Sequence, residues 1–150
     1  MNTLPALNDF LLYENPYVIK RFEINFPNEA HRSKELFTDM LRYLWLCEKH
    51  FLDKKENPND ESLDFIPVMH QEMRAIDNMW HEFILITKDY QDFCNKFFGK
   101  FIHHEPNMQE TLEYNEDNYV KSLSLFLSYT YDVLGETVVK NWFKDHLQDF

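Results

Sequence analysis

The scarcity of glycine constrains this chain more than any other feature of its sequence. Only two of the 150 residues are glycine, Gly99 and Gly135. A turn-rich β-sandwich needs many residues that tolerate a positive φ, whereas long helices need very few. Hydrophobic residues make up 44% of the chain, which is enough apolar material for a buried core. The sequence therefore predicts an all-α fold, a compact bundle of five or six helices in a single domain.

Apolar residues recur at three- and four-residue steps, the spacing of one helix face. The predicted helices run from Pro16 to about Phe26, from about Glu29 to Leu52, from about His70, from Thr87 to Gly99, from about Met108 to Leu134, and beyond Gly135. Thr87 is a candidate N-cap, and Gly99 a left-handed C-cap. Asp53 to Asp64 shows no periodicity and is predicted as a surface loop. We expect residues 1–15 to form a loosely ordered lead-in to a helical domain over residues 16–150.

The charge and the cysteines restrict the partners and the compartment. The formal net charge of −11 repels phosphate backbones and argues against nucleic acid as a partner. It suits a protein that binds cations or a basic protein surface. No apolar stretch approaches membrane-spanning length, so no membrane partner is expected. Cys47 and Cys94, the only cysteines, lie in helical apolar patterns, which favours buried thiols in a reducing compartment and a cytoplasmic location.

The residues that can carry chemistry gather around the fourth predicted segment and the turn after the fifth. Asp77 and His81 are spaced i and i+4, so a carboxylate and an imidazole project about 40° apart from one helix. His103 and His104 follow Gly99 in a short irregular or extended segment. Two imidazoles and a carboxylate form a ligand set for Zn²⁺, or for Fe²⁺ as a two-histidine, one-carboxylate triad.

Other interpretations of the same residues stay open at this point. A histidine hydrogen-bonded to an aspartate one turn away is a common way to satisfy two buried polar groups. Tandem histidines point in different directions in an extended chain, so usually one of them faces a given site. His70 lies eleven residues before His81 and is a further candidate for the cluster. Cys94 is either a nucleophile or, as its apolar face favours, an inert packing residue.

The more specific catalytic motifs that we considered are incomplete in this sequence or absent from it. The stretch His81-Glu82-Phe83-Ile84-Leu85 begins like the zinc-protease helix, but Leu85 stands where the second histidine is required. Helical geometry also places Glu82 about 100° from His81, toward the predicted solvent side. The sequence contains no Pro-Cys-x-x-Cys segment, no glycine-rich phosphate loop and no Gly-x-Ser-x-Gly elbow. No reaction is therefore assigned, and whether the protein is an enzyme stays open.

The central part of the chain also resembles a known family. The residues concerned are Ile76-Asp77-x-Met79-Trp80-His81-x-Phe83-Ile84-Leu85-x-Thr87-x-x-Tyr90-x-x-Phe93-Cys94 and Phe98-Gly99-x-Phe101-Ile102-His103-His104-x-Pro106. This pattern is similar to that of the bacterial members of the glycine-rich domain-containing protein-like family. The resemblance implies a small helical domain and marks the matching positions Asp77, Trp80, His81, Cys94, His103 and His104. The glycine-rich tail of the plant members is missing here, and Glu82 replaces the small hydroxyl residue expected after the histidine.

Two functional hypotheses follow from the sequence. In the first, the protein binds a divalent metal, zinc or iron, with His81 and one tandem histidine as ligands and Asp77 as a third ligand or an orienting partner. An open coordination position would make it a metal-dependent hydrolase or oxygenase. In the second, it is a non-enzymatic acidic protein that binds an unknown basic protein, as an inhibitor or immunity-type partner. The binding surface would then be Asp53 to Asp64 or Glu110 to Asp117.

Overall fold

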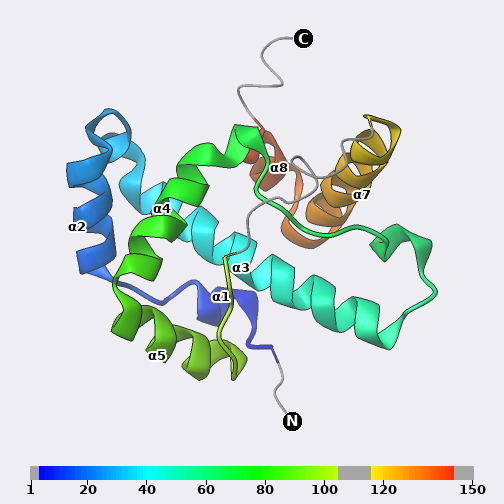
Figure 1. Ribbon diagram of the computed structural model, residues 1–150, viewed down its shortest axis with the longest axis horizontal. Coiled ribbons are helices and arrows are strands. Elements are labelled where there is room, and N and C mark those ends of the chain that lie inside the picture. Colours follow the sequence, from blue (N-terminus) through cyan, green and yellow to red (C-terminus); the bar gives the residue numbers. More distant parts are fainter. Residues whose placement is uncertain (1–3, 105–115, 144–150) are drawn as a thin grey trace. The chain divides into compact units, whose positions relative to one another are not determined.

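A computed structural model describes residues 4–104 and 116–143 of the chain (Figure 1). Within these residues the secondary structure is entirely helical, which confirms the all-α prediction. The described residues belong to two compact units, each made of two stretches of the chain. The first unit takes its residues from Met1–Glu48 and Arg74–His103, and the second from Lys49–Met73 and His104–Phe150. Among the described residues, no helix combines the length and the apolarity needed to cross a bilayer.

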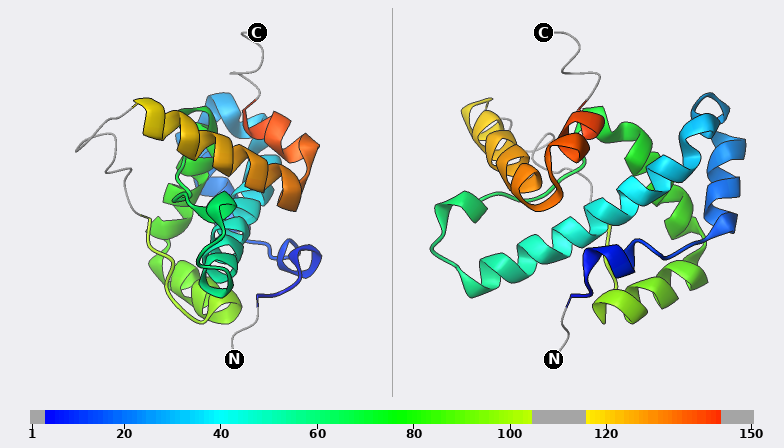
Figure 2. Two further views of the ribbon diagram at one scale, coloured as in Figure 1. Left: turned by 90° about the vertical axis from the view of Figure 1, so that its right-hand side faces the viewer. Right: turned by 180° about the vertical axis from the view of Figure 1, so that it is seen from behind.

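Predicted helices recur with similar bounds at residues 16–25, 74–85 and 87–98 of the first unit, whereas the predicted start near Glu29 is a 3-10 helix and the long helix begins at Ser33. The first unit is built from several helices. They are α1 (Leu7–Phe10), α2 (Pro16–Asn25), the 3-10 helix η1 (Pro27–Arg32), the first part of α3 (Ser33–Glu56), α4 (Arg74–Leu85) and α5 (Thr87–Phe98). α2 lies alongside α4, as both figures of the whole chain show (Figures 1 and 2). Gly99 adopts φ 68° and ends α5 as the left-handed cap that the sequence predicts. The predicted cap at the other end is wrong, since Ile86 is the N-cap and Thr87 the first helical residue.

An aromatic core holds the first unit together and reaches into the N-terminal residues. The rings of Phe83 and Phe93 lie 5.0 Å apart, and the Tyr13 ring lies 4.8 Å from that of Phe93. Phe10 of α1 is fully buried, and its ring lies 5.6 Å from Phe93. The described part of residues 1–15 therefore carries more structure than the loose lead-in that we expected. Helical periodicity does not reveal it, because α1 spans only four residues.

The end of α3 corrects the predicted loop over Asp53 to Asp64. The helix continues to Glu56, and the 3-10 helix η2 (Glu61–Leu63) follows. Charged side chains stabilise this last part: Lys49 pairs with Asp53 at 3.2 Å, and Lys54 and Lys55 lie in the final turn, where the helix dipole favours cations. Apolar periodicity ends before the helix does, so a pattern of buried residues underestimates its length.

The second unit packs the last part of α3 and the 3-10 helices η2 and η3 (Gln71–Met73) with α7 (Glu116–Leu134) and α8 (Glu136–Trp142). α7 and α8 are neighbours in space and are joined by Gly135 (Figure 2). Gly135 has a φ of 95°, which is not helical, so the first helix ends there and the second begins after it. The part of the predicted long helix before Glu116 lies outside the described residues, as does the part of the predicted terminal helix after Phe143. Two buried histidines belong to the core of this unit. His70 lies against Tyr119, Phe126 and Phe143, and His50 bonds the Leu63 carbonyl at 2.9 Å.

These two histidines make stability depend on pH. Burial lowers the pKa of both His50 and His70 below the ordinary value of 6.5. The unfolded chain therefore binds protons before the folded chain does as the pH falls. The stability that the neutral rings provide is complete above about pH 6.5 and is lost as the pH falls through their lower folded pKa values.

We expect the free energy of unfolding to fall between pH 7 and pH 5, and His70→Phe to make this fall smaller. Phenylalanine fills the aromatic surroundings of His70 without a group that takes up a proton. Urea denaturation at the two pH values measures the effect. His31→Gln, at an exposed position on η1, is the matched control and should keep the wild-type slope. A His70→Phe slope equal to that of the wild type would contradict the prediction.

Candidate metal centre

The rotation of α4 decides which of its polar side chains reach solvent. Glu82 is buried, and its two carboxylate oxygens accept hydrogen bonds from Arg21 Nε at 3.1 Å and Asn25 Nδ2 at 3.0 Å. The expectation that Glu82 faces solvent is therefore wrong. Arg21 and Asn25 belong to α2, which covers the flank of α4 that carries Glu82. His81, about 100° away around the helix, is left exposed.

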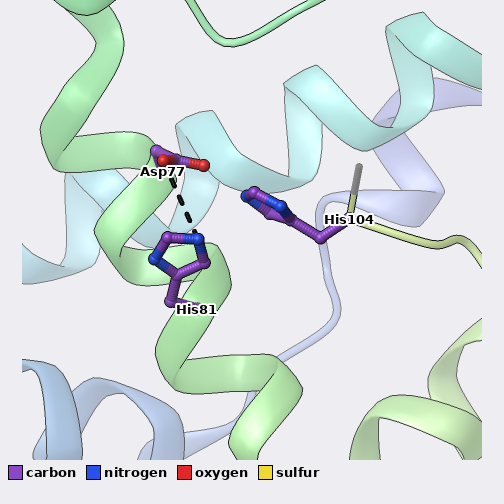
Figure 3. A group of neighbouring side chains, drawn as sticks. All are labelled: Asp77, His81 and His104. Carbon is purple, nitrogen blue, oxygen red and sulfur yellow. Dashed lines mark ion pairs between the residues drawn. The ribbon is translucent and has the colours of Figure 1, made fainter. Parts of the chain in front are cut away.

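Asp77 and His81 lie on the open flank of α4, one turn apart, as the sequence predicts. Asp77 Oδ2 and His81 Nε2 are 3.8 Å apart (Figure 3). The two side chains are 24% and 49% exposed, so the pair is accessible from solvent. Behind it, the Tyr43 phenol on α3 is buried. Burial raises the pKa of Tyr43 well above its ordinary value, and the neighbouring Cys47 and Asp77 add to the shift.

Residues 101–104 follow α5 and the Gly99 cap without helical structure. The rings of Phe101 and His103 lie 4.7 Å apart, and both residues are exposed. Ile102 and His104 are partly buried, which is the alternation expected of an extended chain. One tandem histidine therefore faces outward with Phe101, and the other faces the protein.

His104 is the tandem histidine that meets the pair on α4. Asp77, His81 and His104 each offer one ligand atom, and these atoms all lie within 4.8 Å of one another. The ring of His104 points toward Asp77 and His81, although it comes from a separate segment (Figure 3). His104 directly follows His103, the last residue of the first unit. Among the residues that the structure describes, a carboxylate and two imidazoles thus converge.

The donor set fits a small divalent ion, with a modest closing movement. Ligand atoms about 2.1 Å from a tetrahedral ion lie about 3.4 Å from one another. The 3.8 Å between Asp77 and His81 is close to this value, and because all the ligand atoms lie within 4.8 Å of one another, none needs to approach another by more than about 1.4 Å. Rotation of exposed side chains such as His81 supplies such a movement.

The other sequence candidates do not join this group. The predicted ligand His103 lies on the opposite side of its segment, against Phe101. His70 lies within the aromatic core of the second unit, 5.1 Å from the Phe126 ring. Cys94 is fully buried, and burial raises the pKa of its thiol, although hydrogen bonds with the Ile102 backbone and the Tyr90 side chain lower it. A buried thiol with a raised pKa supports inert packing rather than nucleophilic catalysis.

The acidic stretch at the end of α3 has partners inside the second unit. Asp53 accepts hydrogen bonds from Lys49 and from the Tyr129 hydroxyl, the latter at 2.7 Å. Lys54 pairs with Asp64, and Asp60 accepts from the backbone and hydroxyl of Ser62. These carboxylates are engaged in local structure. Most of the second acidic stretch, Glu110 to Asp117, lies outside the described residues.

Two residues near this group were not predicted to take part in it, although the family resemblance marks Trp80 as a matching position and includes Tyr90 in its pattern. Trp80 Nε1–H donates to the Tyr90 hydroxyl at 3.0 Å, and the Tyr90 hydroxyl donates to the Ile102 carbonyl at 2.5 Å. Both residues belong to apolar helix faces, where periodicity classes them as core. The hydroxyl of Tyr90 and the indole N–H of Trp80 could have indicated them, because a buried tyrosine or tryptophan usually has a hydrogen-bond partner.

Comparison with known proteins gives a family but no activity. Residues 16–128 match the model of the UCP032817-like family, and the chain belongs to this family. The matched residues include Asp77, His81 and His104. A search of the curated proteins found no match, and neither did a search of the solved structures.

The adjacent residues Glu82 and His81 are expected to respond differently to substitution. Glu82→Ala removes two hydrogen bonds to a buried carboxylate and should lower the free energy of unfolding by about 2 kcal/mol. His81→Ala should change it by less than about 0.5 kcal/mol, because His81 is exposed. Chemical denaturation of both variants measures the contrast. Equal losses in the two variants would show that Glu82 does not hold α2 against α4.

Both cysteines are expected to react slowly in the folded protein. Burial raises the pKa of the Cys47 thiol to about 12, and that of Cys94 is raised as well. Few thiolates are therefore present at neutral pH. Alkylation by iodoacetamide, followed by mass spectrometry, should be much faster in urea than in buffer. Rapid modification of Cys94 in the folded protein would revive its interpretation as a nucleophile.

Proposed function

We propose that the protein binds a divalent transition metal, zinc or ferrous iron, through Asp77, His81 and His104. The observation that carries this proposal is the approach of one carboxylate and two imidazole ligand atoms to within 4.8 Å of one another. Oxygen and imidazole nitrogen are ligand types that both metals accept. The absence of a thiolate from this set argues against a structural zinc site rich in cysteine.

The ligand count also bears on what such a metal would do. Structural zinc sites are usually closed by four protein ligands, whereas catalytic sites use three and leave a position for water or substrate. The partial exposure of Asp77 and His81 is consistent with an ion that solvent can reach. The proposed site is therefore of the open kind that supports hydrolysis or, with iron, oxygen chemistry.

We also infer that the UCP032817-like family and the glycine-rich domain-containing protein-like family share this part of the chain. The inference rests on the Asp-x-x-Trp-His pattern at Asp77 to His81 and on the Phe-Gly-x-Phe-Ile-His-His pattern that ends at His104. A cytoplasmic location remains part of the proposal. It is supported by two cysteine thiols, neither of which forms a disulfide.

Metal binding by three variants tests the proposal. Wild-type protein purified without a histidine tag should bind one zinc ion in isothermal titration calorimetry. His81→Ala and His104→Ala should each weaken binding by more than the roughly 10–100-fold that follows the loss of a supporting residue. Asp77→Asn should also weaken binding, because it removes the charge while keeping the size.

His103→Ala is the matched control for His104→Ala. It removes the adjacent histidine, which faces away from the cluster, and should leave zinc affinity unchanged. Elemental analysis of the purified protein shows which metal it carries from the cell. A wild-type protein that contains no metal and cannot be loaded with zinc or ferrous iron would refute the proposal.

A further inference from the structure

We propose that Tyr90 is a positioning residue of this metal centre, which it serves by holding the backbone of Ile102 so that His104 faces Asp77 and His81. This inference rests on the proposed metal-binding function and extends it to a residue that contacts neither the ligands nor the ion. The feature that carries it is a chain of two hydrogen bonds from α4, through α5, to the segment that bears His104.

The Tyr90 hydroxyl is bonded to Trp80 and to the Ile102 carbonyl, and it also interacts with the Cys94 thiol, which itself bonds the Ile102 backbone. Tyr90 is fully buried, and its oxygen accepts a hydrogen bond from Trp80 Nε1 at 3.0 Å. The tryptophan nitrogen can only donate, so the hydroxyl proton is left for the Ile102 carbonyl, 2.5 Å away. Burial raises the pKa of Tyr90, which keeps this proton in place at neutral pH. The direction of both bonds is thus determined.

Trp80 links this anchor to the metal ligands on the same helix. It precedes His81 and follows Asp77 on α4, and its own ring is buried. The helix that supplies two of the three ligand atoms therefore also supplies the donor that orients the Tyr90 hydroxyl. As a result, the spacing between the α4 ligands and the 101–104 segment depends on a pair of directional bonds.

The position of the 101–104 segment determines which of the two adjacent histidines faces Asp77 and His81. Ile102 and His104 lie on one side of the extended segment, whereas Phe101 and His103 lie on the other. Holding the Ile102 carbonyl therefore selects His104 as the inward residue. A slip of one residue would exchange it for His103, because successive side chains point to opposite sides. The Phe101 ring, 5.2 Å from that of Tyr90, adds a contact at the same place.

Tyr90→Phe tests the inference, because it removes the hydroxyl and keeps the ring. Zinc affinity should fall about tenfold, at the lower end of the range for residues that support a ligand. Hydrogen exchange of the metal-free protein should become faster at the amides of residues 101–104. Tyr129→Phe is the matched control, since it also removes a buried tyrosine hydrogen bond, to Asp53. This control should change zinc affinity by less than about twofold, because neither Tyr129 nor Asp53 belongs to the hydrogen bonds that hold Ile102.

Circular dichroism verifies that the variants are folded, and Trp80→Phe provides a second test. It removes the donor to Tyr90, keeps an aromatic ring, and should weaken zinc binding in the same direction. If Tyr90→Phe binds zinc as tightly as the wild type, the inference is overturned while the metal site stands. If the wild type binds no metal, the proposed function fails, and the hydrogen-exchange comparison still decides whether Tyr90 holds the segment.

Discussion

The buried carboxylate of Glu82 is the interaction on which the arrangement of the candidate site depends. It accepts hydrogen bonds from Arg21 and Asn25, and these bonds fix α2 against one flank of α4. A carboxylate removed from water is costly unless its oxygens are paired, so α4 has one favourable rotation against α2. That rotation turns Asp77 and His81 away from α2. The exposure of these two side chains is therefore a consequence of a structural ion pair.

A second constraint acts through the backbone and selects among the histidines. An extended chain alternates its side chains, so His103 and His104 cannot face the same group. In our proposal, the hydrogen bond from Tyr90 to Ile102 selects which of them turns inward. In the proposed site, Glu82 orients the two ligand atoms of α4 and Tyr90 orients the third. Neither residue belongs to the proposed ligand set, yet both bear on its geometry.

Most of the fold follows from apolar periodicity, and the differences have identifiable physical causes. α2, α4 and α5 coincide closely with predicted helices, because buried residues recur along them at helical spacing. The last turn of α3 lies beyond the predicted end because charged residues stabilise it in place of apolar contacts. α1 is too short to show a period, and Phe10 is buried by tertiary contacts that no local pattern encodes. Local signals thus predict where helices form, but less well where they end.

The candidate site was predictable to the extent that it is local. Asp77 and His81 share a helix turn, so their proximity follows from helix geometry alone. The choice of His104 over His103 depends on the non-local contact between Ile102 and Tyr90, and no spacing rule provides it. Glu82 was misplaced for a related reason, since a helical wheel shows which side chains share a face but not which faces a neighbouring helix covers. In a site built in this way, the residues that stabilise the fold differ from the residues that would bind the metal. The buried polar contacts of Glu82 and Tyr90 define the frame, and the exposed ligand His81 contributes little to it, so the donor set can change without loss of the fold.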